Sequence, residues 1–347
     1  MKVKELIITK INKEGRINVA QFIEFCQYSN NGYYIKNNPI GKKNDFVTAP
    51  EISQMFGEIL ATFIINYWNE NIKTEFNLIE LGPGTGTLIR DILRTADVNK
   101  NFLDAAYLIL IEKNQTLKYQ QKKNLNNLNF IKAKWVEEFN IKNTRSSIIY
   151  SNEFFDCFPV RQFYKKNKWY ERYINYNKTQ KIFNFESQEV KNQKILSHLE
   201  KFNSVKVAEI SESRKKYFES ICQYIKKNKG IFITIDYGYK KPQSYLSLQT
   251  IYNHNKTHLF ENIGSQDITA HVNFDEFYNI AYKYELKIDL YCTQKDFLIG
   301  FGLKERKKKL QKNKSEKAYK KIEFDYERLT DKTQMGEIFK VLVISCI

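Results

Sequence analysis

The amino-acid sequence predicts an α/β fold with a doubly wound, mostly parallel sheet. Short apolar runs typical of buried strands recur along the chain and alternate with segments of helical periodicity. One apolar run, residues 77–81, is followed by three closely spaced glycines and then by a helical pattern. Strands that alternate with helices form parallel sheets, because each helix returns the chain to the same edge of the sheet.

The first seventy-five residues have mainly helical patterns. We expect helices at residues 3–13 and 19–28, and a long third helix after Thr48. Thr48 and Glu51 have the spacing of a capping box, with a proline in the first turn. Between the second and third helices, residues 32–46 form a turn-rich loop that could cover a ligand.

The rest of the chain alternates strands with helices. The predicted strands are residues 77–81, 106–112, 128–133, 147–153, 230–238, 286–293 and 338–344. The predicted helices between them are residues 88–95, 114–124, 211–227 and 273–284.

One segment between the fourth and fifth strands departs from this alternation. Residues 163–185 alternate aromatic and polar side chains around Asn167 and Lys178, which predicts an antiparallel hairpin. We therefore expect an N-terminal helical segment, residues 1–75, packed on a catalytic domain of residues 76–347 that carries an insertion at about 160–210.

Composition limits the class of protein. The 347 residues, 42% of them hydrophobic, suffice for a large buried core, and no run of eighteen apolar residues or secretory signal is present. We expect a cytoplasmic protein without a presequence or membrane span. The five cysteines never form C-x-x-C, and His254 and His258 lack the glutamate of H-E-x-x-H, so we expect no metal site.

The net charge of +17 is compatible with nucleic-acid binding, since a basic surface attracts phosphates. The charge is spread along the chain, however, and the one dense basic cluster lies at residues 304–321. We interpret this cluster as a solvated helix or loop near the C-terminus in preference to a nucleic-acid patch.

The glycine-rich segment E-L-G-P-G-T-G, residues 80–86, points to a small ligand. Gly82, Gly84 and Gly86 lack a Cβ atom, so the backbone can turn sharply and approach a ligand closely. The spacing differs from the G-x-G-x-x-G of dinucleotide sites, and no Gly-Lys-Ser/Thr follows. The alternative is a tight strand-to-helix turn without a ligand.

Two acidic residues indicate which ligand this is. Glu80 suits the cationic S-adenosylmethionine, whereas it would repel a pyrophosphate. Glu112 follows the second strand, where an acid accepts the ribose hydroxyls in doubly wound folds. The predicted cofactor contacts are Glu80, Gly82, Pro83, Gly84, Gly86, Glu112 and Asn152.

Several longer motifs occur in a fixed order along the chain. They are G-Y-Y at 32–34, D-F-V-T-A-P-E-I-S-Q-M-F-G at 45–57, E-L-G-P-G-T-G at 80–86, S-N-E-F-F-D-C-F-P-V-R-Q-F at 151–163, I-D-Y-G-Y at 235–239, D-I-T-A-H-V-N-F at 267–274 and M-G-E-I-F-K-V-L at 335–342. Together they resemble the MidA family of S-adenosylmethionine-dependent methyltransferases over nearly the whole chain. The basic segment 304–321 is not a feature of that family.

This resemblance implies a Rossmann-like class I methyltransferase fold and a protein substrate. The mitochondrial member of the family is an assembly factor of respiratory complex I that dimethylates an arginine symmetrically. The resemblance therefore implies a protein-arginine N-methyltransferase that acts on a subunit of complex I (NADH dehydrogenase) or a similar protein.

The candidate catalytic residues are Glu153, Asp156 and His271. Glu153 and Asp156 follow the fourth strand, and paired carboxylates at that edge could grip two nitrogens of a guanidinium. Glu153 could instead cap the next segment, and Asp156 could be an ordinary turn acid. His271 could line the pocket and accept a proton, or anchor a loop by a hydrogen bond. Asp236 could join the site or order a loop.

Two other functions remain open at this stage. A nucleic-acid methyltransferase is favoured by the net charge, although N-E-F-F at residues 152–155 replaces the N/D-P-P-Y signature of enzymes that methylate planar amines. A non-catalytic assembly scaffold would not need the intact acids and glycines of the cofactor motif.

Overall fold

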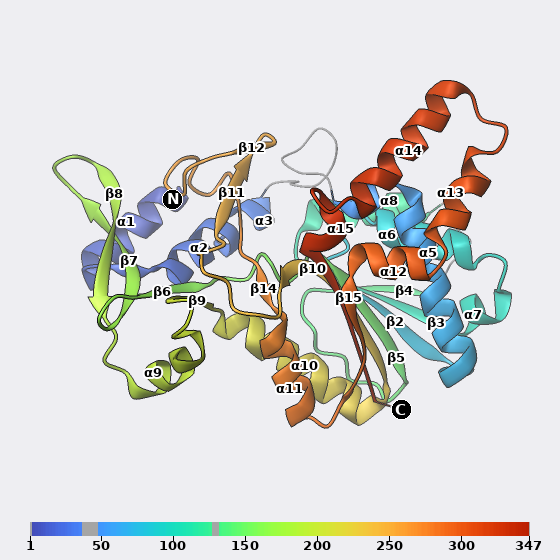
Figure 1. Cartoon of the computed structure of the whole chain (residues 1–347), viewed down its shortest axis with the longest axis horizontal. Helices are drawn as coiled ribbons and strands as arrows, with labels where there is room; N and C mark the ends of the chain where they lie inside the picture. The colour runs from blue at the N-terminus through green and yellow to red at the C-terminus, as the bar shows by residue number, and fades with distance from the viewer. Residues whose placement is uncertain (1, 37–47, 127–131, 347) are drawn as a thin grey trace.

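The computed structural model describes residues 2–36, 48–126 and 132–346 (Figure 1). Its central eight-stranded sheet has the order β15-β16-β10-β5-β2-β3-β4, with β14 paired to β10. The strands are β2 (Phe76–Leu81), β3 (Ala106–Ile111), β4 (Ala133–Val136), β5 (Ser147–Asn152), β10 (Gly230–Tyr239), β14 (Val272–Asn273), β15 (Lys287–Thr293) and β16 (Phe339–Cys346). All neighbours are parallel except β16, which is antiparallel to β10 and β15.

This sheet confirms the predicted doubly wound, mostly parallel fold. The third predicted strand, residues 128–133, overlaps β4 only at Ala133, and residues 128–131 lie outside the described part of the chain. β2 is buried along its whole length. Two adjacent residues of this strand, Leu78 and Ile79, belong to hydrophobic clusters on opposite faces of the sheet. A strand covered on both faces is mainly apolar, and β2 follows this rule except at the buried polar residues Asn77 and Glu80.

Helices cover both faces of the central sheet (Figure 1). α5 (Gln54–Tyr67) and α6 (Thr87–Ala96) supply most of the helical core on one face, and α10 (Glu212–Asn228) and α11 (Phe274–Lys283) supply it on the other. The other helices that follow β2 are α7 (Lys100–Ala105), α8 (Gln115–Leu125), α9 (Gln193–Leu199), the 3₁₀ turn Glu200–Phe202, α12 (Gln294–Gly300), α13 (Leu303–Gln311), α14 (Glu316–Thr330) and α15 (Met335–Ile338).

The first two predicted helices occur as α1 (Val3–Glu14) and α2 (Val19–Tyr28). They pack away from the central sheet, in a cluster that joins Ile7 and Phe22 to Ile174 of β7. Phe22 also contacts the ring of Phe183. Two smaller antiparallel sheets accompany them on the left in Figure 1.

The predicted hairpin belongs to the larger of these two sheets. This sheet contains β1 (Ile17–Asn18), β6 (Arg161–Lys165), β7 (Trp169–Asn177), β8 (Ile182–Glu189) and β9 (Val207–Ile210). The turns at Asn167 and Lys178 lie where the aromatic alternation placed them, between β6 and β7 and between β7 and β8. The smaller sheet contains β11 (Gln249–Tyr252), β12 (Asn255–Lys256) and β13 (Asp267–Thr269).

The long helix predicted after Thr48 is interrupted, so that prediction was wrong. α4 (Ala49–Ile52) stops at Ser53, whose extended backbone (φ −153°) separates it from α5. The Ser53 hydroxyl accepts the N–H of Met55 and caps α5, whereas Thr48 makes no side-chain cap. Glu51 accepts a hydrogen bond from the Thr85 hydroxyl, so its carboxylate binds the glycine loop. A π-helical turn, Trp68–Ile72, follows α5.

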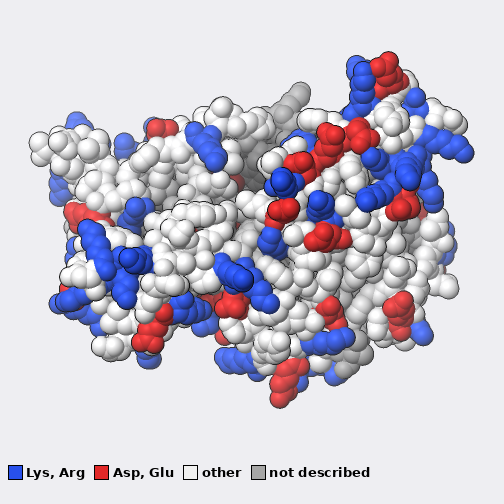
Figure 2. Space-filling view, viewed as in Figure 1, with Lys and Arg blue, Asp and Glu red and all other residues white. Residues whose placement is uncertain are grey.

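The basic segment 304–321 forms much of a helical hairpin, α13 and α14, which projects from the body of the protein (Figure 1). Arg306 anchors the hairpin, because its guanidinium donates two hydrogen bonds of 2.7 and 2.8 Å to the Glu58 carboxylate on α5. On the face shown in Figure 2, basic side chains on this hairpin mix with acidic ones, and basic side chains also occur across the rest of that face. Within residues 2–36, 48–126 and 132–346, no helix combines the length and apolar character needed to cross a membrane.

Candidate active site

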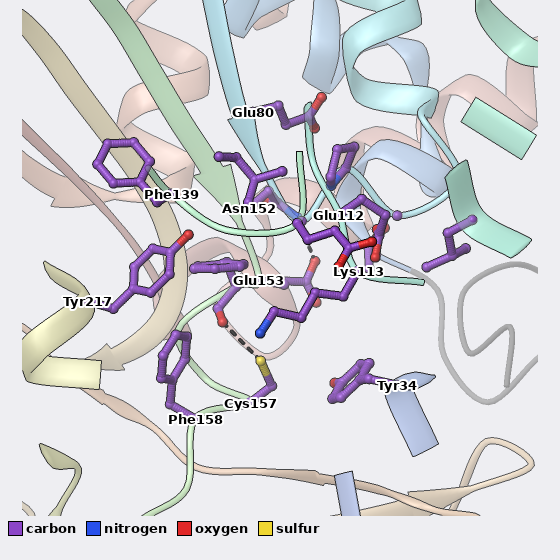
Figure 3. Close-up of a pocket in the computed structure, with 18 of the residues that line it drawn as sticks. Tyr34, Glu80, Glu112, Lys113, Phe139, Asn152, Glu153, Cys157, Phe158 and Tyr217 are labelled. Carbon is purple, nitrogen blue, oxygen red and sulfur yellow. Dashed lines mark hydrogen bonds between the residues drawn. The ribbon is translucent and has the colours of Figure 1, made fainter. Parts of the chain in front are cut away.

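A cleft of about 610 Å³ lies at the carboxyl ends of β2, β3 and β5. This edge is where open α/β sheets bind ligands, because the loops that leave neighbouring strands diverge there. Figure 3 shows Glu112 and Glu153 in the cleft, with the rings of Phe158 and Tyr217 on one side and Tyr34 on the other. Tyr34 belongs to the short helix α3 (Tyr33–Lys36) and Tyr217 to α10, so distant segments close the cleft.

The glycine loop borders the cleft, but its three glycines have different neighbours. Gly82, Gly84 and Gly86 have φ angles of 62°, 55° and 82°, a conformation that glycine adopts without strain. Gly82 and Gly84 line the cleft together with Pro83. A Cβ on Gly82 would lie 2.8 Å from the ring of Phe154.

Gly86 lies outside the lining of the cleft, where it is the N-cap residue of α6. A Cβ there would lie 3.2 Å from Cα and 3.3 Å from Cγ of Gln121. The absence of a side chain at Gly86 therefore makes room for α8, which differs from its predicted role as a cofactor contact.

Glu80 lines the cleft at the end of β2, as predicted. Its side chain is 2% exposed and accepts a 3.1 Å hydrogen bond from the Tyr150 hydroxyl. Burial raises the pKa of Glu80 to about 8, and the nearby Glu112 carboxylate adds to the shift. A buried carboxylate in this state favours a cationic ligand, because the ligand's charge offsets the cost of ionisation.

Glu112 lies directly after β3 and points into the cleft (Figure 3). Its Oε1 accepts the backbone N–H of Asn114 at 2.8 Å, and its Oε2 accepts the side-chain amide of Gln121 at 3.2 Å. Burial raises its pKa despite these bonds. Each carboxylate oxygen accepts a second hydrogen bond readily, so Glu112 could hold a pair of hydroxyl groups.

Glu153 and Asn152 lie where β5 ends, and both line the cleft. Glu153 has φ +50°, which is strained for a residue with a side chain. Its Oε1 accepts hydrogen bonds from the Ala49 N–H at 3.3 Å and the Asn152 amide at 3.0 Å. Burial, followed by repulsion from Asp156, raises the pKa of Glu153 to about 8. Among the described residues, the buried Asn152 Oδ1 has no hydrogen-bond partner.

Asp156, the predicted partner of Glu153, lies outside the lining of the cleft and is 5% exposed. Burial raises its pKa, although Tyr237 and Arg214 act in the opposite direction. Asp236 also lies outside the cleft lining and is fully buried. Its Oδ2 accepts the backbone N–H groups of residues 154–156, so Asp236 orders the loop that carries Asp156.

His271 also lies outside the cleft lining. Its backbone N–H donates to the Ser247 hydroxyl at 2.9 Å, and its Nδ1 lies 3.1 Å from the Gln243 side-chain oxygen. Burial lowers its pKa. These contacts are those of a loop anchor, the alternative that the sequence left open. Arg214 stabilises the same region by donating to the carbonyl oxygens of Phe155 and His271.

Tyr34 lies in the loop predicted to cover a ligand, of which residues 37–46 are outside the described part of the chain, but sequence reasoning missed the other aromatic walls of the cleft. Tyr28 and Tyr34 stack with ring centroids 5.9 Å apart, and the Tyr34 hydroxyl donates a 2.7 Å hydrogen bond to Asp267. Phe139 and Tyr217 line the same cleft. Tyr34 and Asp267 both lie in family-like motifs, but the contact between them depends on tertiary structure.

The ionisable residues of the cleft are mostly acidic, in contrast to the basic composition of the whole chain. Among the described residues that line it, seven are glutamates and only Lys113 is basic, although the net charge of the protein is +17. The glutamates are Glu24, Glu51, Glu80, Glu112, Glu137, Glu138 and Glu153. Such a cleft favours cations and disfavours phosphates.

Comparisons with known proteins agree with this geometry. The model of the family Methyltransf_28, described as "Putative S-adenosyl-L-methionine-dependent methyltransferase", matches residues 59–292. The chain is 27% identical to human "Protein arginine methyltransferase NDUFAF7, mitochondrial", covering 97% of this chain and 82% of that protein. It is 26% identical to the homologue of Caenorhabditis elegans, covering 89% of this chain and 78% of that protein.

A crystal structure from Burkholderia thailandensis has the same fold. That protein, bound to S-adenosyl-homocysteine, superposes with a TM-score of 0.88 at 22% identity, covering 99% of this chain and 92% of that one. The fold is therefore that of the class I methyltransferases.

Proposed function

Because this chain belongs to the Methyltransf_28 family of S-adenosyl-L-methionine-dependent methyltransferases, we propose that it is a protein-arginine N-methyltransferase. The observation that carries this proposal is the excess of glutamates in the cleft of a strongly basic protein. Both the cofactor and an arginine side chain are cationic, and a cleft rich in carboxylates attracts both. The relatives named as protein arginine methyltransferases support the same substrate class.

The cofactor fits the part of the cleft formed by β2 and β3. Gly82, Pro83 and Gly84 would border it, Glu80 would face its ammonium group, and Glu112 would accept its ribose hydroxyls. When bound, S-adenosylmethionine supplies a methyl group activated by a sulfonium. The main task of the protein is then to hold the nucleophile in line with that methyl group.

Glu153 is the residue that we propose to hold the guanidinium. The predicted pair with Asp156 is replaced by Glu153 and its neighbour Asn152, whose buried Oδ1 has no hydrogen-bond partner within the described part of the chain and is a second acceptor at the end of β5. A guanidinium has five N–H donors in one plane and can bond both acceptors. Because the pKa of Glu153 lies near neutrality, its carboxylate can also accept the proton that the arginine loses.

The acidic cleft argues against a nucleic-acid substrate, since carboxylates repel phosphates. Because the motifs resemble those of the MidA family, we also propose that the substrate is a subunit of respiratory complex I or a similar protein. A scaffold without activity would not need buried acids with raised pKa values in the cleft. All five cysteines are free thiols, which supports the cytoplasm or another reducing compartment.

The test is methyl transfer to arginine-containing peptides, followed by mass spectrometry. Glu153→Gln keeps the shape of the side chain but removes the carboxylate, so we expect transfer to fall by about 100-fold or more. S-adenosyl-homocysteine affinity should change by only a few-fold. Glu285→Gln, at an exposed acid that does not line the cleft, should retain activity. Methylation of another residue type, or unchanged transfer by Glu153→Gln, would refute the proposal.

A further inference from the structure

Gln121 of α8 joins the two parts of the cleft that face the cofactor. Its side-chain nitrogen donates a 2.7 Å hydrogen bond to the carbonyl oxygen of Gly84 and a 3.2 Å hydrogen bond to Oε2 of Glu112. Gly84 belongs to the loop after β2 and Glu112 to the loop after β3, so one amide connects the carboxyl ends of two neighbouring strands. Gln121 itself is fully buried and does not line the cleft.

The orientation of this amide is determined by a third contact. The indole N–H of Trp135, on β4, donates a 2.9 Å hydrogen bond to the side-chain oxygen of Gln121. Since the oxygen accepts this bond, both N–H groups of the amide point toward Gly84 and Glu112. Gly86 provides the necessary space, because a Cβ there would press against Gln121 at 3.2–3.3 Å.

Glu112 is consequently held at both oxygens. The backbone N–H of Asn114 binds Oε1 and Gln121 binds Oε2, which limits rotation of the carboxylate about its terminal bond. A carboxylate that accepts two vicinal hydroxyl groups must present both oxygens at a defined angle. Loss of the Gln121 contact would free one oxygen and leave a buried acceptor without its donor.

We propose that Gln121 is a positioning residue for the cofactor. It fixes the glycine loop and the Glu112 carboxylate in the relative positions that binding of the ribose hydroxyls requires. It acts through Glu112 and Gly84 and makes no contact of its own with the cleft. This inference rests on the cofactor of the family and is independent of arginine as the methyl acceptor. It also gives Gly86 a role: this glycine admits Gln121.

The experiment measures how well the full-length protein distinguishes nucleosides with and without ribose hydroxyls. Adenosine and 2′,3′-dideoxyadenosine are titrated calorimetrically, and the ratio of their affinities reports the hydroxyl contacts. The wild-type protein should favour adenosine. In Gln121→Leu, which keeps the volume but removes the amide, the ratio should fall by about tenfold, which corresponds to about 1.4 kcal/mol.

Asn124→Leu is the matched control. Asn124 lies one turn further along α8 and donates a 2.8 Å hydrogen bond to the Thr85 carbonyl oxygen, but has no hydrogen bond to Glu112. This variant should therefore retain the wild-type ratio even if both affinities decline. Trp135→Phe, which removes the donor that orients the amide, should lower the ratio to an intermediate value and provides the test if Gln121→Leu does not fold.

Two results would overturn the proposal. If Gln121→Leu weakens both nucleosides equally, the amide has only a structural role in the glycine loop. If the wild-type protein does not distinguish the two nucleosides, Glu112 does not hold the ribose. If the protein does not methylate arginine but the affinity ratio behaves as expected, only the proposal of an arginine substrate is contradicted. The role of Gln121 then stands.

Discussion

Asp236 and Phe155 are joined by a 2.8 Å hydrogen bond from the backbone N–H of Phe155 to the Asp236 carboxylate. The same oxygen accepts the N–H groups of residues 154 and 156, at 3.2 and 3.3 Å. Asp236 lies on β10 and is fully buried, so this loop after β5 is held by a side chain 81 residues away. The loop carries Phe154, which packs on Gly82, so its position also bears on the cofactor loop.

Asp236→Ala should destabilise the protein by about 2–3 kcal/mol, because three backbone donors lose their acceptor. The measurement is urea unfolding, with hydrogen exchange of residues 153–158 to locate the effect. Asp97→Ala, at an exposed acid, is the control and should leave both unchanged. Uniform loss of protection throughout the chain, without a larger effect in the loop, would contradict this role.

Gly82→Ala should weaken S-adenosyl-homocysteine binding by tenfold or more, because the new Cβ would lie 2.8 Å from the Phe154 ring in a backbone of φ +62°. Gly15→Ala separates these two causes. Gly15 has φ +81°, but a Cβ there would meet no atom of the described residues within 4 Å. It should cost only the backbone strain of about 1–2 kcal/mol and leave binding intact. Equal binding by both variants would show that the contact with Phe154 is not important.

Binding of S-adenosylmethionine should strengthen as pH rises from 6 to above 8. Burial raises the pKa of Glu80 to about 8, so the free protein holds a proton there that a cationic ligand must release. Calorimetry in buffers of different ionisation enthalpy counts the protons released. In Glu80→Gln this release should be smaller, and the pH dependence should flatten. An identical proton count for the variant and the wild-type protein would exclude Glu80 as the group that titrates.

Stability should respond to pH in the opposite direction. Glu80 and Glu153 lose their protons near pH 4.5 when unfolded but only near pH 8 when folded. Between these values the unfolded state binds fewer protons, so the free energy of unfolding falls as pH rises. The double variant Glu80→Gln, Glu153→Gln should lose less stability than the wild-type protein between pH 5 and pH 8 in urea titrations. A wild-type slope in this variant would show that other groups dominate.

Arg306→Met should loosen the hairpin of α13 and α14 without affecting the cleft. The change removes both hydrogen bonds to Glu58, which is 7% exposed, and should cost about 1–2 kcal/mol, since Arg94 still pairs with that carboxylate. Hydrogen exchange in α13 should increase, whereas S-adenosyl-homocysteine affinity should not change. Lys308→Met, which removes a charge from the same helix, is the control. Unchanged exchange in α13 would mean that apolar contacts alone hold the hairpin.

Much of the fold could be predicted from local patterns. The strands predicted at residues 77–81 and 147–153 correspond to β2 and β5 within one residue at each end, and the helix at 19–28 has bounds identical to those of α2. The interruption at Ser53 could not be predicted in this way, because the apolar spacing continues across it. Its backbone is extended there for tertiary reasons: Ala49 contacts Glu153, and Glu51 contacts Thr85.

The candidate site also has features that the sequence predicts and features that depend on tertiary structure. The sequence by itself determined the cofactor class, because the strand, the glycines and the acids at Glu80 and Glu112 are local features whose order implies a ligand site. Only the tertiary structure decided which residues support them. Gln121 reaches Gly84 and Glu112 across two loops, and His271 contacts Gln243 outside the cleft lining. Side chains meet according to how helices pack on the sheet, and the spacing of residues along the chain does not specify that packing.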